Sequence, residues 1–134
     1  MTITCDTSVL VPALASWHVA HASSRAALGE VRVIGAHVLL ETYSVLTRLP
    51  GRQRIDARQA GAVVEALDWE VVSLAGPQHR ALIADLARSG VSGGAVYDAL
   101  VGATAAAHSL TLLTRDRRAQ RTYDALGIPY AMQD

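Results

Sequence analysis

The chain has 134 residues, 12 acidic and 12 basic side chains, and a hydrophobic fraction of 51%. This length suits one domain with a sizeable core, and the apolar content excludes a disordered chain. The net charge of zero does not by itself indicate a nucleic-acid-binding protein. All twelve basic residues are arginine, which fits either genome composition or bidentate contacts with phosphate.

Strand-like and helix-like segments alternate along the whole chain. We expect strands at residues 2–5, 31–34, 71–74, 110–114 and 129–132, where short apolar runs end in polar or turn-forming residues. Helices are expected from about residue 9 and over residues 17–28, 36–49, 56–67, 77–88, around residue 98 and over 117–126. The alternation predicts a single domain over residues 1–134, a three-layer α/β/α sandwich on a mostly parallel sheet.

The most apolar stretch runs from Val91 to Leu113 and carries one formal charge, Asp98. It predicts a buried helix that leads into a buried strand. Small residues such as Gly102 should let this helix pack tightly, and Gly93-Gly94 is interpreted as a point where chain approaches chain closely. An isolated carboxylate there costs several kcal/mol unless a positive charge or hydrogen bonds compensate it.

The sequence favours a cytoplasmic protein that does not associate with a membrane. The start, MTITCD, lacks the basic and apolar regions of a signal peptide, and Asp98 and His108 interrupt the apolar stretch. The single cysteine, Cys5, has no partner for an internal disulfide, and we expect it to be a small buried side chain.

Four carboxylates stand out by their positions. Asp6 follows the first strand, Asp116 follows the fourth, and Glu41 and Asp98 lie near the beginnings of helices. Each has an ordinary explanation as a helix cap, a first-turn acid, a buried structural acid or a turn residue. Because strand ends and helix N-termini share one rim in this architecture, we expect all four to converge there.

Converging acids repel one another unless a cation neutralises them. Carboxylate oxygens suit Mg²⁺ or Mn²⁺, and such a site suits cleavage of a phosphodiester by a metal-bound water.

Four segments in this order resemble the motifs of PIN-domain ribonucleases, most closely the VapC-type toxins of bacterial type II toxin–antitoxin pairs. They are DTSVLVPAL at 6–14, LLETYSVLTRL at 39–49, YDALVGATA at 97–105 and LLTRD at 112–116. No single motif is specific, but together they cover nearly the whole chain with the spacing of the family.

The resemblance implies a Mg²⁺- or Mn²⁺-dependent endoribonuclease that leaves 5′-phosphate and 3′-hydroxyl ends. It assigns the metal-binding, catalytic quartet to Asp6, Glu41, Asp98 and Asp116, with supporting hydroxyls at Ser8 and Thr114. It also implies a five-stranded parallel sheet between helices, a homodimer, an RNA substrate and a cognate antitoxin protein as partner.

The sequence departs from the family pattern just after the last acid. Members often carry an acid or Asn two residues on and an aromatic residue beyond it, where this chain has Arg118 and Ala119. A second-metal ligand is therefore left open. Arg115, Arg117 or Arg118 could bind substrate phosphate or could simply be solvated at the start of a helix.

A second group of arginines follows Glu41. These residues could contact RNA backbone or an acidic antitoxin tail, or form a solvated loop; they are Arg48, Arg52, Arg54 and Arg58.

Other functions remain as alternatives. A catalytically silent PIN-like binding module would keep the fold without the chemistry. A Mg²⁺-dependent phosphatase with Asp6 as nucleophile would want an acid where Ser8 stands, and a phosphorylated receiver domain would need a lysine, which the chain lacks. The histidines lack a zinc-site pattern, and the tryptophans and tyrosines are too scattered to predict a base-stacking platform.

Overall fold

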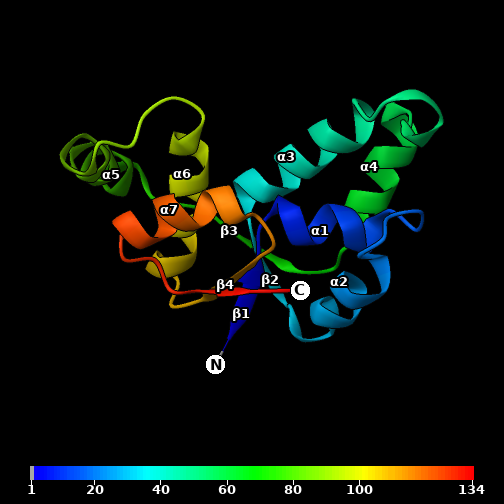
Figure 1. The fold of residues 1–134 in the computed structure, drawn as a ribbon, viewed down its shortest axis with the longest axis horizontal. Coiled ribbons are helices and arrows are strands. Elements are labelled where there is room, and N and C mark those ends of the chain that lie inside the picture. The colour runs from blue at the N-terminus through cyan, green and yellow to red at the C-terminus, as the bar shows by residue number, and fades with distance from the viewer. Residues whose placement is uncertain (1) are drawn as a thin grey trace.

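The computed structural model describes residues 2–134 and confirms an α/β architecture with helices on both sides of parallel strands (Figure 1). The first half contains β1 (Ile3–Cys5), α1 (Thr7–Leu14), α2 (His21–Ala27), η1 (Leu28–Glu30), β2 (Val33–Gly35), α3 (Ala36–Thr47), η2 (Gly51–Gln53) and α4 (Ala57–Glu65). The second half contains β3 (Glu70–Val72), α5 (Gly76–Ser89), α6 (Ala95–Ala107), β4 (Thr111–Thr114), α7 (Arg117–Ala125) and β5 (Tyr130–Met132).

The five strands are parallel, but main-chain hydrogen bonds divide them into two ladders. One has the order β1-β4-β5 and the other pairs β2 with β3. β2 lies beside β1, where the Thr4 hydroxyl donates to the carbonyl of Val33 at 2.7 Å. This side-chain donor occupies the seam where the predicted five-stranded sheet would have continuous main-chain pairing.

The main core is formed by side chains of β1, β4 and the helices that flank them. Cys5 and Leu112 are completely buried on neighbouring strands, and Tyr123 of α7 is the largest completely buried side chain. The prediction that Cys5 is a small buried side chain is confirmed, and burial raises the pKa of its thiol well above the usual range. No helix within residues 2–134 is both long and apolar enough to cross a bilayer.

Helix α6 packs between α5 and α7, and its small residues decide how closely it can approach them. A Cβ atom added at Gly102 would lie 3.0 and 3.1 Å from side-chain carbons of Ile128 and 3.2 Å from the Tyr123 ring. The packing is tight here, but against α7 and the segment before β5 rather than against the sheet, where the small residues predict it. At Gly93 and Gly94 the prediction of close approach is wrong, because an added Cβ would meet nothing within 4 Å; Gly93 instead supplies a positive φ of 63° before the helix.

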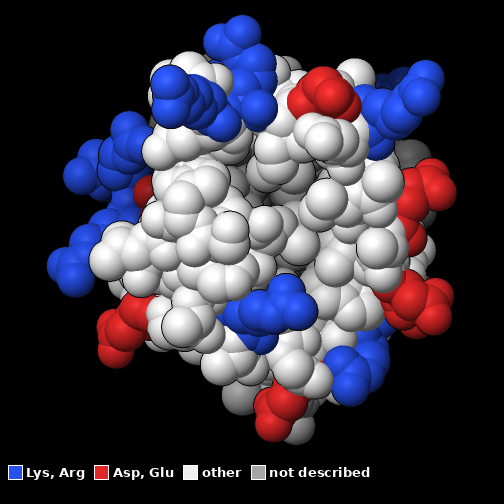
Figure 2. All heavy atoms as spheres, turned by 90° about the vertical axis from the view of Figure 1, so that its right-hand side faces the viewer, with Lys and Arg blue, Asp and Glu red and all other residues white. Residues whose placement is uncertain are grey.

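The face on the right-hand side of Figure 1, where α2 and α4 lie, is largely uncharged. Figure 2 shows that its centre is hollowed and that basic side chains stand mainly towards its rim. Two exposed apolar side chains, Trp17 and Val19, belong to the connection between α1 and α2.

We predict that Gly102→Ala lowers the free energy of unfolding by about 1–3 kcal/mol, because the added methyl overpacks the contact with Ile128 and Tyr123. Gly61→Ala is the matched control, since Gly61 also lies inside a helix but has nothing within 4 Å of its Cβ position. The control should gain about 0.5–1 kcal/mol from helix propensity. Urea denaturation measures both, and equal stabilisation by the two substitutions would contradict the packing argument.

Candidate active site

The acidic residues lie at the rim formed by the carboxyl ends of β1 and β4. Asp6 follows β1 directly, and its main-chain N–H donates to the carbonyl of Leu113 on β4 at 3.1 Å. Asp116 follows β4 after one intervening residue and begins α7 as its N-cap. The pairing of β1 with β4 therefore brings together two acids that lie 110 positions apart in the sequence.

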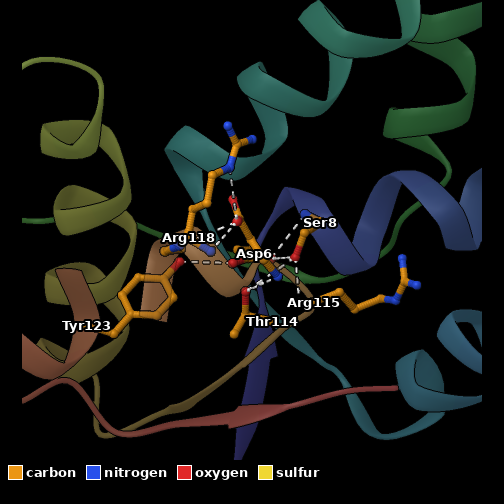
Figure 3. Close-up of polar contacts among 8 residues, drawn as sticks. Asp6, Ser8, Thr114, Arg115, Arg118 and Tyr123 are labelled. Atoms are coloured by element: carbon orange, nitrogen blue, oxygen red, sulfur yellow. Dashed lines mark hydrogen bonds and ion pairs between the residues drawn. The ribbon is translucent and has the colours of Figure 1, made fainter. Parts of the chain in front are cut away.

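Asp6 is the most enclosed of the four acids, only 6% exposed, and it is held by donors on both carboxylate oxygens (Figure 3). The main-chain N–H of Ser8 donates to Oδ1 at 3.0 Å, and the Ser8 hydroxyl donates to the same oxygen. The Tyr123 hydroxyl donates to Oδ2 at 2.9 Å. Burial raises the pKa of Asp6, while hydrogen bonds from Ser8, Thr114 and Tyr123 act in the opposite direction.

The hydroxyls of Ser8 and Thr114 join the two strand ends. Their oxygens lie 3.3 Å apart, Ser8 Oγ accepts from the main-chain N–H of Arg115 at 2.7 Å, and Thr114 Oγ1 accepts from that of Asp116 at 3.1 Å. Both predicted supporting residues therefore lie inside the acidic rim and contact the segments that carry its first and last acids.

Glu41 reaches the rim from α3. Its Oε1 accepts from the hydroxyl of Thr7, the residue after Asp6, and its Oε2 lies 4.0 Å from His37 Nε2, one turn earlier on the same helix. Thr7 thus orients Glu41, while the main-chain N–H of the next residue, Ser8, orients Asp6.

Asp98 lies in the first turn of α6 and is half-buried. Burial raises the pKa of its carboxyl to about 6, with further increases from the negative charges of Asp116, Glu41 and Asp6 and a decrease from Arg118. The other three acids are therefore near enough for their negative charges to raise the pKa of Asp98.

Asp116 is both a rim acid and a helix cap. Its Oδ1 accepts from the main-chain N–H groups of Arg118 at 2.9 Å and Ala119 at 3.3 Å. The Arg118 guanidinium lies 3.9 Å from the same oxygen, but its side chain is 97% exposed, so this ion pair contributes little to stability.

The donor set fits a hard divalent cation, because it consists of carboxylate and hydroxyl oxygens. The negative charges of the carboxylates repel one another. Within residues 2–134, no three or more His, Cys, Asp or Glu side chains form a ready-made metal site. Three of the acids accept hydrogen bonds from Ser8, Tyr123, Thr7 or the first turn of α7 instead. Holding an ion would therefore need small side-chain rotations.

The predicted phosphate-binding arginines lie beside the acids rather than among them. Arg115 points away from Asp6 in Figure 3. Arg115 and Arg117 line a cleft of about 390 Å³ together with Gln120 and Gln133. The buried Arg115 Nε has no hydrogen-bond partner within residues 2–134.

Sequence reasoning missed two contributors to this region, Tyr123 and Tyr97. Tyr123 lies seven residues after Asp116 on the face of α7 that also buries Ala119, and its hydroxyl donates to Asp6. The amphipathic pattern of this helix could have predicted that Tyr123 is buried. Tyr97 and His37 come from different helices, yet their rings are parallel within 7° with centroids 5.5 Å apart.

Comparison with known proteins agrees with this geometry. Residues 3–125 match the PIN domain family. Ribonuclease VapC40 of Mycobacterium tuberculosis is 44% identical over 124 residues, which cover 92% of each protein. Ribonuclease VapC27 of the same organism is 42% identical over 125 residues, covering 92% of this chain and 90% of the relative.

Two solved structures share the fold. VapBC2 from Rickettsia felis, crystallised bound to a DNA fragment from its promoter, has a TM-score of 0.70 with 16% identity and covers all of both chains. VapC20 of Mycobacterium tuberculosis, a Sarcin-Ricin loop cleaving toxin, has a TM-score of 0.69 with 18% identity and covers 90% of this chain and 94% of its own. From the family match and the identity to its relatives, the chain belongs to the PIN-domain family, in its VapC-type group.

Proposed function

We propose that this protein is a metal-dependent endoribonuclease that acts as the toxin of a toxin–antitoxin pair. The observation that carries the proposal is the placement of Asp6 and Asp116 at the carboxyl ends of the paired parallel strands β1 and β4, with Glu41 hydrogen-bonded to Thr7 beside Asp6. The negative charges of these three acids also raise the pKa of Asp98. The relatives named as ribonucleases support the choice of RNA as the substrate.

In this proposal the four carboxylates hold Mg²⁺ or Mn²⁺ and so gather positive charge where the scissile phosphate binds. The ion, when bound, makes water more acidic and neutralises charge on the phosphate. Tyr123 and Ser8 fix the orientation of Asp6, and Thr7 fixes that of Glu41. Burial and the negative charges of Asp116, Glu41 and Asp6 raise the pKa of Asp98, and a bound cation would offset that repulsion.

Phosphates beyond the scissile bond are assigned to Arg115 and Arg117. They line the cleft of about 390 Å³, and both flank Asp116 in the sequence. Guanidinium groups suit phosphate oxygens in both charge and shape.

The proposed partners are a cognate antitoxin and a second copy of the chain. The antitoxin is supported by the VapBC2 neighbour, whose structure contains both proteins of such a pair. The dimer is proposed from the resemblance to VapC-type toxins alone.

The purified protein should cleave members of a mixed RNA panel in Mg²⁺ or Mn²⁺, leave 5′-phosphate ends, and lose activity in EDTA. Asp98→Asn should reduce the cleavage rate about a hundredfold or more, because it removes a direct ligand rather than an outer contact. Asp68→Asn, at an exposed acid in the loop before β3, is the matched control and should cleave normally.

Metal-dependent cleavage by Asp98→Asn at the rate of the unmodified protein would overturn the proposed chemistry. A folded protein, free of antitoxin, that binds Mn²⁺ but cuts no RNA would instead favour the binding module without catalysis.

Without metal, Asp98→Asn should be more stable than the unmodified protein at pH 7.5 by about 1–2 kcal/mol, and equal to it near pH 4. The pKa of about 6 in the folded protein lies above the ordinary value of 3.8, so the folded state holds this proton more tightly. The contribution of Asp98 to stability is therefore present below about pH 4 and is lost as the pH rises through about 6.

Thermal denaturation in EDTA across this pH range measures the effect, with Asp68→Asn again as control. Adding Mg²⁺ at pH 7.5 should raise the melting temperature of the unmodified protein and leave that of Asp98→Asn nearly unchanged. A stabilisation of Asp98→Asn that is the same at pH 4 and pH 7.5 would contradict the electrostatic cause.

Tyr123→Phe should weaken Mn²⁺ binding about 10- to 100-fold, because it removes a donor that orients Asp6. Tyr130→Phe is the control, since the Tyr130 hydroxyl donates at 2.7 Å to Asp124, which is not one of the rim acids. Isothermal titration calorimetry measures both. Equal Mn²⁺ affinities of the two variants would show that Tyr123 does not position the carboxylate.

A further inference from the structure

A second cleft opens beside the acidic rim, between α3 and the beginning of α6. It has a volume of about 330 Å³, and its lining comprises His37, Leu40, Glu41, Ser44, Arg48 and Tyr97. Glu41 thus belongs both to the proposed metal site and to this cleft. Tyr97 precedes Asp98 on α6, so the cleft borders the acids from two helices.

The aromatic ring of Tyr97 is unusually open for a residue next to a proposed active site. The residue is 56% exposed, and its ring lies parallel to the His37 imidazole, with 7° between the planes and 5.5 Å between the centroids. His37 therefore supports the ring from a neighbouring helix while much of its surface faces solvent. A flat, supported and exposed ring is a good surface for another planar group.

We propose that this cleft is a nucleobase-binding subsite, in which an unpaired base of the RNA substrate stacks on Tyr97 beside the scissile phosphate. The inference rests on the proposed ribonuclease function and deepens it by assigning a contact that binds an unpaired nucleotide. Recognition of single-stranded RNA commonly uses stacking of splayed bases on aromatic side chains.

The rest of the lining fits a nucleotide better than a purely apolar partner. Arg48 supplies a positive charge at one end of the cleft, where a backbone phosphate of the stacked nucleotide would be attracted. Ser44 offers a hydroxyl that can donate to or accept from a base edge, and Leu40 supplies an apolar wall. Glu41, at the other end, belongs to the proposed metal site, so an ion there would draw the adjacent phosphate towards the acids.

The test measures binding of fluorescently labelled single-stranded oligoribonucleotides to protein carrying Asp116→Asn, which prevents cleavage while an asparagine can still cap α7. In this background Tyr97→Ala should weaken binding about tenfold, and Tyr97→Phe should have little effect because the ring remains. Tyr43→Ala is the matched control, since Tyr43 is an exposed tyrosine of α3 that does not line the cleft.

A single abasic nucleotide, moved along the oligonucleotide, locates the stacked base. With the abasic nucleotide at the stacked position, the RNA should bind about tenfold more weakly than intact RNA to protein that retains Tyr97. Tyr97→Ala should not weaken the binding of this abasic RNA any further. At other positions the effects of the abasic nucleotide and of Tyr97→Ala should add.

The outcomes separate the subsite from the function on which it rests. If the unmodified protein cleaves RNA but Tyr97→Ala binds and cleaves it equally well, the subsite is overturned and the ribonuclease stands. If the unmodified protein neither binds nor cleaves RNA, the function fails and the subsite with it. A Tyr97→Ala variant that changes the oligomeric state in light scattering, with RNA affinity unaltered, would assign the cleft to a protein interface instead.

Discussion

The buried carboxylate of Asp6 is the constraint on which the site depends. It lies where the parallel strands β1 and β4 end, almost without exposure to water, and a charge in such a place is costly unless donors surround it. Ser8 donates to this carboxylate from the first turn of α1, and Tyr123 donates to it from α7, the helix that follows β4. One carboxylate therefore ties together the N-terminal strand, the helix after it and a helix more than a hundred residues later.

The other acids are arranged around this fixed point with less support. Burial and three neighbouring negative charges raise the pKa of Asp98, which means that the folded protein tolerates its ionised form poorly. A protein under selection for stability alone would not keep such a cluster, because neutral replacements would relieve the repulsion. Under the proposed function the cluster would become favourable when a cation binds, because the cation would offset the repulsion among the acids.

The sequence predicted the alternation of elements and the four acids because both depend on local signals. Apolar runs mark the strands, and Asp6 and Asp56 each cap a helix as their positions indicated. Asp116, whose ordinary explanation was a turn residue, also caps a helix. What the sequence could not predict depends on contacts between distant segments. Tyr123 lies in a polar helix with no sign of its partner, and Tyr97 meets His37 only because α3 and α6 pack together. The prediction for Gly93-Gly94 was wrong because a glycine can permit either a close approach of two chain segments or a positive φ. Only the backbone conformation shows which of the two applies.

If Tyr97 binds a base and Asp98 an ion, as we propose, helix α6 would connect substrate binding to cleavage. Tyr97 and Asp98 are consecutive residues of its first turn, so a base stacked on one and an ion held by the other have a nearly fixed separation. The position of that turn is set further along the helix, where Gly102 lets α6 approach Ile128 and Tyr123. Tyr123 in turn holds Asp6. A nucleotide that stacks well on Tyr97 should therefore align its phosphate with the acids, whereas the phosphate of one that stacks poorly should lie further from them. Because Tyr97 and Asp98 belong to one rigid helix, the quality of base stacking would then affect the cleavage rate.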